Sequence, residues 1–408
     1  MQYLLSIFNM NIIKRETYLK QIRPYYNQSL IKVLTGQRRV GKSFILKQVY
    51  QELKEENPEG HFIFIDFERM EFDSIKTYQE LHDFIKQKSI TNQNYLLIDE
   101  IQQIEGFERA LRSLFSEGNY DIYITGSNSN LVSGETATFL SGRQIEIKIF
   151  SLSYLEFLQF NQLEANTVSL QRYLKHGGLP YLKNLPNDDE VVMDYLKNIY
   201  ATILYRDVVS RNQIRDFPFL ENLVRFLAEN TGSLVSANSI ADFIKSQRQS
   251  KSVSVIIGYL NYLCQAYLVS KVSRQEVKGK RIFETGEKYY FQDIGLRNTL
   301  TGFNADDISK VIENVVYNYL ITNGYKVRIG KLGEKEIDFV AEKNGEYSYY
   351  QVTYLLSHEK VIEREFGNLL SIKDNYPKYV VSMDDFPITS SYQGIKQISL
   401  LDLLTNKI

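Results

Sequence analysis

The sequence predicts an α/β protein in which a helix-covered parallel β-sheet is followed by a helical connector, a three-helix module and a second α/β domain. Three observations predict this class. The stretch from Gly36 to Ser43 spells G-x-x-x-x-G-K-S between an apolar strand and an amphipathic helix. A continuous apolar run ends at Asp99-Glu100, as expected of a parallel strand buried on both faces. Two alternating segments meet at Asn344-Gly345, a dipeptide typical of hairpin turns.

Length and composition indicate a globular chain of several domains. Its 408 residues exceed one ordinary domain, and 43% of them are hydrophobic. The net charge is -1, so any affinity for nucleic acid must come from a local basic face. The single cysteine, Cys264, excludes a disulfide framework. No apolar run approaches roughly 18 residues and no signal peptide is visible, so we expect a cytoplasmic protein without a membrane span.

The loop motif is of the kind that binds nucleotide phosphates. Successive backbone N–H groups at the start of a helix cradle the phosphates. Lys42 would reach the β- and γ-phosphates, and the Ser43 hydroxyl would ligate Mg²⁺. We interpret Arg38 and Arg39 as exposed or close to phosphate rather than catalytic. The residues expected to line the nucleotide are Gly36, Gln37, Arg38, Arg39, Val40, Gly41, Lys42 and Ser43.

The two acids that end the apolar run complete a Mg²⁺–nucleotide pair. Asp99 is placed to hold the Mg²⁺ together with Ser43. Glu100 is placed to orient and deprotonate an attacking water molecule. The sequence therefore predicts catalytic chemistry at this strand end.

Further strands are expected at 61–67, 121–127 and 144–150, and the helical segments between them favour right-handed crossovers. Asn128, just beyond the second of these strands, is a candidate to read the γ-phosphate and the attacking water; the alternative is a helix cap formed by Ser127 or Asn128. Arg143 is a candidate arginine finger, in cis or toward a neighbouring subunit. Its alternative is a surface arginine that enters a strand.

The loop, the strand ending "LLIDE" and the strand ending "ITGSN" together resemble the AAA-type ATPases. The resemblance implies that the strand "DIYITG" lies between the loop strand and the acidic strand. It also implies ATP as the nucleotide, and no guanine-reading Asn-Lys-x-Asp motif occurs in the chain.

Residues 151–215 have a helical period broken at Gly177-Gly178, which predicts a connector or a lid over the nucleotide. Residues 216–292 then read as three helices and a two-stranded wing, the plan of a winged helix. Basic residues before the third helix and on the wing predict contacts to double-stranded DNA; the alternative is a module for protein contacts or packing. These residues are Lys245, Arg248, Lys251, Lys280 and Arg281.

Residues 293–408 follow the order α-β-β-β-α-β, the plan of a restriction-endonuclease-like core. An active core of this kind has an Asp on one strand and Glu-x-Lys on the next, and its acids bind Mg²⁺. Here Gln and Thr replace Glu and Lys, so we expect a degenerate site; Lys360 or Glu365 on the following helix is an alternative replacement. The residues of this site are Glu313, Glu336, Asp338, Gln351 and Thr353.

The whole chain resembles a bacterial and archaeal family of uncharacterised ATP-binding proteins. The stretches that carry the resemblance include "TGQRRVGKS", "GGLPYL", "YYFQDIGLRN", "IENVVYNYL" and "YYQVTY". It implies a P-loop AAA-type ATPase domain at 12–150, a winged helix at 216–292 after the connector, and an endonuclease-like domain at 293–408. In this family Gln-Val stands in place of Glu-x-Lys.

Three functions remain open on this reading. The first is a Mg²⁺-dependent ATPase that acts as a nucleotide-driven switch on or beside double-stranded DNA, alone or as a homo-oligomer. The second is an ATP-regulated, metal-dependent nuclease. The third is a non-enzymatic ATP-binding module that contacts a partner protein, against which Glu100 argues because such a module needs no water-activating acid.

Overall fold

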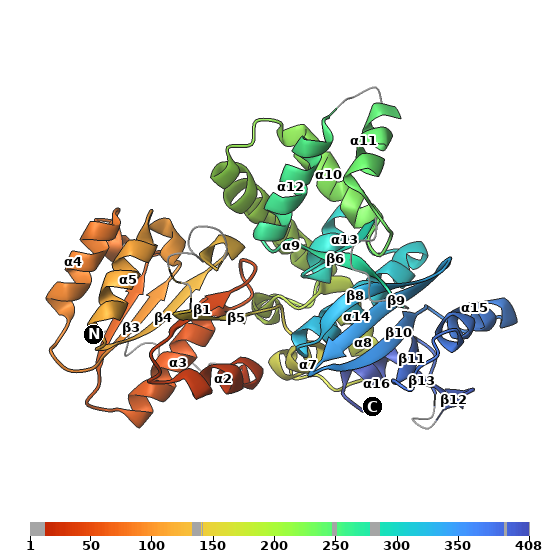
Figure 1. Cartoon of the computed structure of the whole chain (residues 1–408), viewed down its shortest axis with the longest axis horizontal. Coiled ribbons are helices and arrows are strands. Elements are labelled where there is room, and N and C mark those ends of the chain that lie inside the picture. The colour runs from red at the N-terminus through yellow and green to blue at the C-terminus, as the bar shows by residue number, and fades with distance from the viewer. Residues whose placement is uncertain are drawn as a thin grey trace. The chain divides into compact units, whose positions relative to one another are not determined.

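The chain forms two compact units in the computed structural model, which describes residues 13–132, 140, 142–246, 251–277, 286–386 and 390–407. The first unit comprises Met1–Phe150 with Gln265–Tyr267, and the second comprises Ser151–Cys264 with Leu268–Ile408. Figure 1 labels the elements of both units. Within the described ranges, no helix has the length and apolar character needed to cross a membrane.

Five described strands form a parallel sheet in the first unit. Their order is β2 (His61–Asp66), β3 (Asn94–Asp99), β4 (Tyr120–Gly126), β1 (Ile31–Thr35) and β5 (Gln144–Lys148). The expected place of β4, between the strand before the loop and the acidic strand, is confirmed. Because all these pairings are parallel, the loop after β1 and the two acids at the end of β3 lie at the same edge of the sheet.

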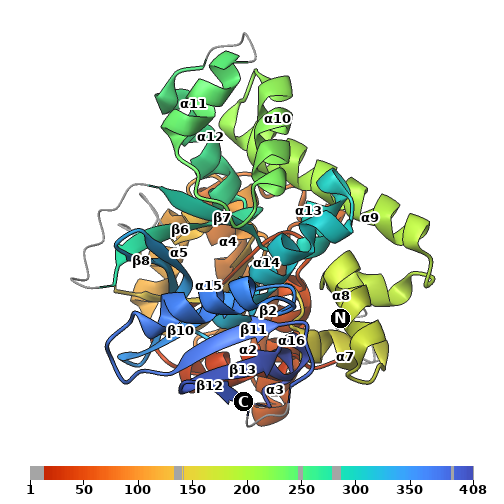
Figure 2. The ribbon, with the colours of Figure 1, turned by 90° about the vertical axis from the view of Figure 1, so that its right-hand side faces the viewer.

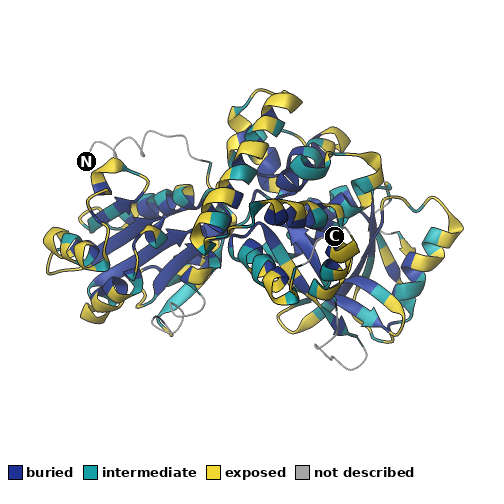
Figure 3. Cartoon of the chain, turned by 90° about the horizontal axis from the view of Figure 1, so that it is seen from above, coloured by how far each residue is buried: buried dark blue, intermediate teal, exposed yellow. Residues whose placement is uncertain are grey.

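Helices cover both faces of this sheet, as its buried strands require. The helices α4 (Tyr78–Lys88) and α5 (Phe107–Glu117) share one apolar core with the strands. The helices α3 (Lys42–Glu56) and α2 (Glu16–Ile22) lie on the other face (Figure 1). Figure 3 shows the strands buried and the outer helix faces exposed.

The second unit begins with a run of helices, the first two of which pack into its core. In chain order they are α7 (Tyr154–Asn161), α8 (Thr167–His176), α9 (Asp189–Thr202), a π-helical segment (Ile203–Ser210), α10 (Phe217–Glu229), α11 (Ala237–Ser246) and α12 (Val253–Gln265). Phe157 of α7, Leu174 of α8 and Val315, farther along the chain, belong to one buried cluster. The predicted connector is therefore part of the second unit, and its role as a lid stays a prediction.

Eight described strands form the sheet of the second unit. Their order is β12 (Ser391–Tyr392), β13 (Ile395–Ser399), β11 (Lys378–Ser382), β10 (Glu346–Val352), β9 (Lys335–Lys343), β8 (Lys326–Leu332), β6 (Val269–Glu276) and β7 (Glu287–Phe291). The helices of this part are α13 (Ile294–Thr301), α14 (Ile308–Thr322), α15 (Glu359–Leu370) and α16 (Leu400–Leu404). From α14 to β11 the chain has the predicted order α-β-β-β-α-β. The turn residues Asn344 and Gly345 have φ of 54° and 84°, as the predicted hairpin turn requires.

The two strands predicted as a wing also extend this sheet. β6 pairs with β7 in the antiparallel sense and, from Arg274 to Glu276, with β8 in the parallel sense. Figure 2 shows these strands side by side, with α15 lying over β10 and β11. A boundary at residue 292 therefore runs through one sheet. The pattern of a single hairpin did not reveal this, because β6 and β8 are joined by a long-range pairing.

The stretch "QDIGLRN" holds the helices of the second unit together through Asp293. Its carboxylate accepts the backbone N–H of Gly178 at 2.9 Å and that of Leu296 at 3.3 Å. Gly178 has no room for a side chain, since a Cβ there would lie 2.4 Å from the carbonyl oxygen of Leu152. The Gly177-Gly178 break is therefore a docking point for Asp293 as well as a helix end.

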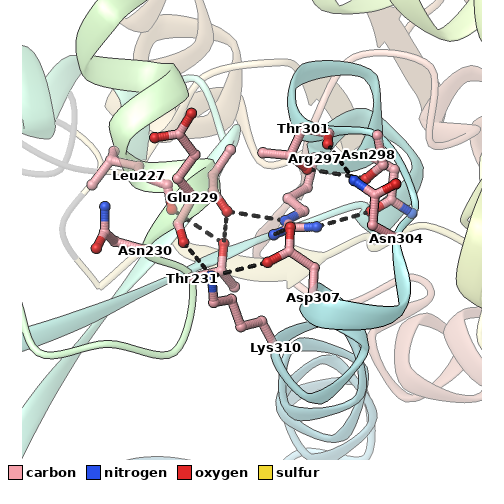
Figure 4. Close-up of polar contacts among 12 residues, drawn as sticks. Leu227, Glu229, Asn230, Thr231, Arg297, Asn298, Thr301, Asn304, Asp307 and Lys310 are labelled. Carbon is pink, nitrogen blue, oxygen red and sulfur yellow. Dashed lines mark hydrogen bonds and ion pairs between the residues drawn. The ribbon is translucent and has the colours of Figure 1, made fainter.

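Arg297 of the same stretch is fully buried and binds the end of α10 (Figure 4). Its Nε donates to the carbonyl oxygen of Ala228 at 3.0 Å, and its Nη2 lies 2.9 Å from Asp307. Lys310 also contacts Asp307, at 2.9 Å. These contacts join α10, α13 and α14 through one buried guanidinium.

Candidate functional site

The loop between β1 and α3 has a backbone that requires glycine at two positions. Gly36 has φ of +143°, and a Cβ there would lie 2.1 Å from the carbonyl oxygen of Ile149. Gly41 has φ of +97° and immediately precedes α3. Among the described side chains, none caps α3, so the N–H groups of its first turn face the loop. This arrangement presents donors and the positive end of a helix dipole to an anion.

The side chain of Lys42 lies inside the loop and is 4% exposed. Its Nζ donates to the carbonyl oxygens of Gly36 and Gln37, each at 3.0 Å. The same Nζ lies 3.8 Å from Oε1 of Glu100. The structure therefore brings the loop lysine next to the second acid of the acidic strand.

The other loop residues differ in exposure. Gln37, Arg38 and Val40 are buried, whereas Arg39 is exposed and has φ of 70°. Nη1 of Arg38 lies 3.4 Å from the carboxylate of Glu68. The loop arginines were expected to be either exposed or close to phosphate. Arg39 is exposed, whereas Arg38 is not.

Arg15, a residue that sequence reasoning missed, supports the loop from outside. Its Nη1 donates to the carbonyl oxygen of Val40 at 2.8 Å and to that of Phe150 at 3.0 Å. The guanidinium thus ties the loop to the chain that follows β5. No local motif marks this arginine, so the sequence held no signal for it.

Asp99 meets both of its partners at the end of β3. The hydroxyl groups of Thr125 and Ser43 donate to its carboxylate. Burial raises the pKa of Asp99 to about 6, and the two hydrogen bonds act in the opposite direction. Ser43 and Asp99, the residues predicted to hold Mg²⁺, therefore lie together. Thr125 was missed, although its place in "ITGS", at the end of the strand next to β3, was a usable signal.

Glu100 is held in an unusual backbone conformation beside the loop. Its φ is 54°, a left-handed value that costs free energy in a residue other than glycine. Its N–H donates to Oγ1 of Thr125 at 3.0 Å. Its carboxylate accepts from Nε2 of Gln102 and, at 3.4 Å, from Oγ of Ser127. Gln102 is a further residue that the sequence reading missed.

Asn128 forms the helix cap that was its alternative role. Its side-chain carbonyl accepts the N–H of Asn130 at 2.7 Å and caps a short 3-10 turn, Ser129–Leu131. Ser127, one residue earlier, is the side chain that contacts Glu100. A role for Asn128 in reading a phosphate stays a prediction.

Arg143 lies at the edge of the sheet opposite the loop. The carbonyl of Arg143 accepts the N–H of Ile31 at 2.7 Å, at the amino end of β1. The loop follows Thr35 at the other end, roughly 15 Å of strand away. Parallel pairing of β5 with β1 fixes the backbone of Arg143 at the far edge, which does not favour an arginine finger acting in cis, and that role stays a prediction. A role toward a neighbouring subunit stays a prediction.

The predicted degenerate site forms a cluster around a lysine that was not expected there. Nζ of Lys288, on β7, lies 3.0 Å from Glu313, 2.9 Å from Glu336 and 3.7 Å from Asp338. Burial alone would lower the pKa of Lys288, but the three carboxylates outweigh it and raise that pKa. Lys288 therefore supplies the cation that was sought on α15 at Lys360.

Of the two residues that replace Glu and Lys, Gln351 lies on β10 and Thr353 follows its last residue. Oε1 of Gln351 accepts the N–H of Asp338 at 3.4 Å. The backbone N–H of Thr353 donates to the carbonyl oxygen of Val381 at 3.0 Å. Both side chains are buried.

The residues predicted to contact DNA are described only in part. Lys245 is exposed on α11. Lys251 forms an ion pair with Asp216 and lies 5.5 Å from the ring centre of Phe219. Arg248, Lys280 and Arg281 lie outside the described residues.

Comparison with known proteins identifies two domains. Residues 28–158 match a family model described as an AAA domain. Residues 167–307 match a domain of unknown function (DUF8612). Among solved structures, a match is a Walker-type ATPase of Pyrococcus abyssi, with a TM-score of 0.48 and 17% identity over 71% of this chain and 95% of that chain.

Two relatives match over most of their length. An uncharacterised protein of Haemophilus influenzae is 36% identical over 96% of this chain and 98% of its own. An uncharacterised protein of Methanocaldococcus jannaschii is 30% identical over 85% of this chain and 76% of its own. The chain therefore belongs to the family of these uncharacterised proteins, whose N-terminal part in this member is an AAA domain.

Proposed function

We propose that the chain is a Mg²⁺-dependent ATPase that acts as a nucleotide-driven switch on or beside double-stranded DNA. The observation that carries the ATPase part is the place of Glu100, whose carboxylate lies 3.8 Å from Nζ of Lys42. AAA domains in general use ATP and Mg²⁺, which agrees with the match at residues 28–158. A module that only binds ATP has no need of an acid held in this way.

The groups at the loop fit ATP and Mg²⁺ chemically. The N–H groups of the loop and of the first turn of α3 would bind the phosphate oxygens. Lys42 would exchange its contacts with the loop carbonyls for phosphate oxygens. Ser43 and Asp99 would hold Mg²⁺, which neutralises charge that develops on the phosphates.

Glu100 would act as the base toward an attacking water molecule. Gln102 and Ser127 would keep its carboxylate oriented, since both donate to it. The backbone of Glu100 is fixed by Thr125, which also donates to Asp99. The two acids are therefore positioned through one shared hydroxyl.

The proposal of DNA contact rests on the helices and strands from α10 to β7. Their order of three helices and an antiparallel pair fits a winged helix, in which the third helix, here α12, enters the major groove. Val235, between α10 and α11, forms an antiparallel bridge with Glu287 of β7. This bridge extends the β6–β7 pair by one short segment. Lys245 offers an exposed cation on α11.

ATP turnover by the purified full chain tests the ATPase part. We expect Mg²⁺-dependent hydrolysis that Lys42→Ala abolishes. Lys54→Ala, at the other end of α3, is the matched control and should hydrolyse ATP at the native rate. Absence of turnover in the native chain, with ATP still bound, would favour the non-enzymatic alternative.

DNA binding is tested separately by fluorescence anisotropy with a labelled duplex at two salt concentrations. We expect binding that weakens steeply with salt and is weakened further by Lys245→Glu. Lys197→Glu, an exposed residue of α9 outside the winged-helix segment, should leave the affinity unchanged. Equal affinities of the two variants would remove the support for this face.

A further inference from the structure

The carboxylate cluster of the second unit surrounds a buried ammonium group. The side chain of Lys288 is 3% exposed. Its three carboxylate neighbours come from two elements, Glu313 from α14 and both Glu336 and Asp338 from β9. Glu336 and Asp338 are two positions apart on one strand, so their side chains reach the same face. The cluster is therefore assembled by the fold around the lysine.

Donors from the protein also contact two of these acids. The hydroxyl of Tyr290 donates to the same Oε1 of Glu313 that contacts the lysine, at 2.6 Å. The backbone N–H of Val352 donates to Oδ2 of Asp338 at 2.8 Å. Such hydrogen bonds help to satisfy carboxylates that are largely buried.

A second cation and a glycine complete the surroundings. Nη2 of Arg274 lies 3.8 Å from Oε2 of Glu336. A Cβ on Gly232 would lie 2.8 Å from Oε2 of Glu313, so a larger residue at this position would displace that carboxylate. A second cation thus lies near one of the three acids.

The cluster does not fit the divalent ion that an active endonuclease-like core uses. Such an ion would need the space among the carboxylates that the ammonium of Lys288 fills, and two cations at that distance would repel each other. Within the described part of the chain, no group of three or more acidic, histidine or cysteine side chains is placed to hold a metal ion. The position of Lys288 among the carboxylates and the lack of a free group of metal ligands in the described residues both argue against a divalent ion here.

We propose that Lys288 is the internal counter-cation of this cluster and takes the place of a divalent ion, so that the second unit is held together without metal and cannot bind one at Asp338. This proposal is independent of the ATPase and opposes the nuclease alternative. It also gives a reason for Gln351 and Thr353, because a core without a metal has no use for Glu and Lys at those positions.

The stability of Lys288→Met tests the role of the ammonium, since methionine keeps the length and removes the charge. Leaving buried acids without their partner should lower the Tm of the second unit by about 10 °C. Lys271→Met is the matched control, because Lys271 forms an exposed ion pair with Glu287 on the same strand pair. Its Tm should stay within about 2 °C of the native value. Equal Tm values for the two variants would overturn the proposal.

A double variant separates charge from packing. Lys288→Met with Glu313→Gln removes one acid along with the lysine, so its Tm should rise above that of Lys288→Met alone. A Tm equal to or below that of the single variant would show that the lysine acts through its shape and would contradict the counter-cation role.

Mn²⁺ binding, measured by electron paramagnetic resonance without nucleotide, tests the claim about metal. The native chain and Asp338→Asn should bind the same number of ions. Lys288→Met should gain one ion, and the added change Asp338→Asn should remove it. An unchanged ion count in folded Lys288→Met would contradict the claim that the lysine takes the place of the ion.

The comparison of the native chain with Asp338→Asn decides the matter if Lys288→Met does not fold. Equal Mn²⁺ binding, with no cleavage of supercoiled or linear DNA by either protein, supports the proposal. Mn²⁺ binding or DNA cleavage that Asp338→Asn abolishes would overturn it and establish the nuclease.

Discussion

The hydroxyl of Thr125 contacts both of the adjacent acids, Asp99 and Glu100, whose carboxylates have different neighbours. Its hydroxyl donates to the carboxylate of Asp99 and accepts the backbone N–H of Glu100 at 3.0 Å. The carboxylate of Asp99 faces Ser43, whereas that of Glu100 faces Gln102 and Ser127. One hydroxyl therefore holds both the carboxylate of Asp99 and the backbone of Glu100.

We predict that Thr125→Val lowers the rate of ATP hydrolysis by about tenfold to a hundredfold, because a small misplacement of catalytic groups is costly. Thr125→Ser keeps the hydroxyl and should retain most of the activity. Steady-state turnover at saturating ATP is the measurement. Equal rates for the two variants would show that the hydroxyl does not position the acids.

The pH dependence of the Mg²⁺ requirement follows from the same residue. Asp99 must be ionised to hold Mg²⁺, and burial raises its pKa to about 6, so the Mg²⁺ concentration for half-maximal turnover should rise as pH falls through this value. The hydrogen bond from Thr125 opposes the rise in pKa. In Thr125→Val the acidic limb should therefore move to higher pH than in Thr125→Ser. Protonation of ATP itself is the same in both, and coincident limbs would contradict the prediction.

A buried ion pair joins β1 and β4 at the element scale. Lys32 and Asp121 are 0% and 1% exposed and contact each other, and Asp121 also accepts from the hydroxyl of Tyr123 at 2.8 Å. We predict that Asp121→Asn destabilises the first unit by about 3–5 kcal/mol, because it leaves the ammonium of Lys32 without its charged partner. Urea unfolding measures this. Glu117→Gln, which breaks the exposed pair with Lys86, should have no measurable effect, and similar losses in both variants would contradict the prediction.

In the second unit, the buried carboxylate of Asp293 likewise connects separate elements. It caps α13 and binds the N–H of Gly178, so Asp293→Ala should cost about 2–4 kcal/mol from a lost cap and a buried unsatisfied donor. Asp188→Ala removes the cap of α9 at an exposed site and should cost about 1 kcal/mol. Unfolding of both variants in urea gives the difference. A cost for Asp293→Ala no larger than that for Asp188→Ala would show that the contact with Gly178 is unimportant.

Across the whole molecule, features that depend on a short stretch of sequence could be predicted. Features that depend on contacts between distant segments could not. The loop, the acidic strand and the turn at Asn344-Gly345 each lie within a short stretch, and each was read correctly as an element. Lys288 was missed because its partners lie on α14 and β9, and only the folded sheet brings them together. The same limit applies to Arg143, whose distance from the loop depends on the pairing of β5 with β1.

Single-turnover ATP hydrolysis by Glu100→Gln, with ATP affinity measured on the same protein, tests whether Glu100 is the catalytic base. If Glu100 activates water beside Lys42, the rate should fall by about 10²–10⁴-fold while ATP·Mg²⁺ still binds. Glu117→Gln, an exposed glutamate of the same unit, should hydrolyse ATP at the native rate. Hydrolysis by Glu100→Gln at the native rate would show that Glu100 does not activate the water molecule.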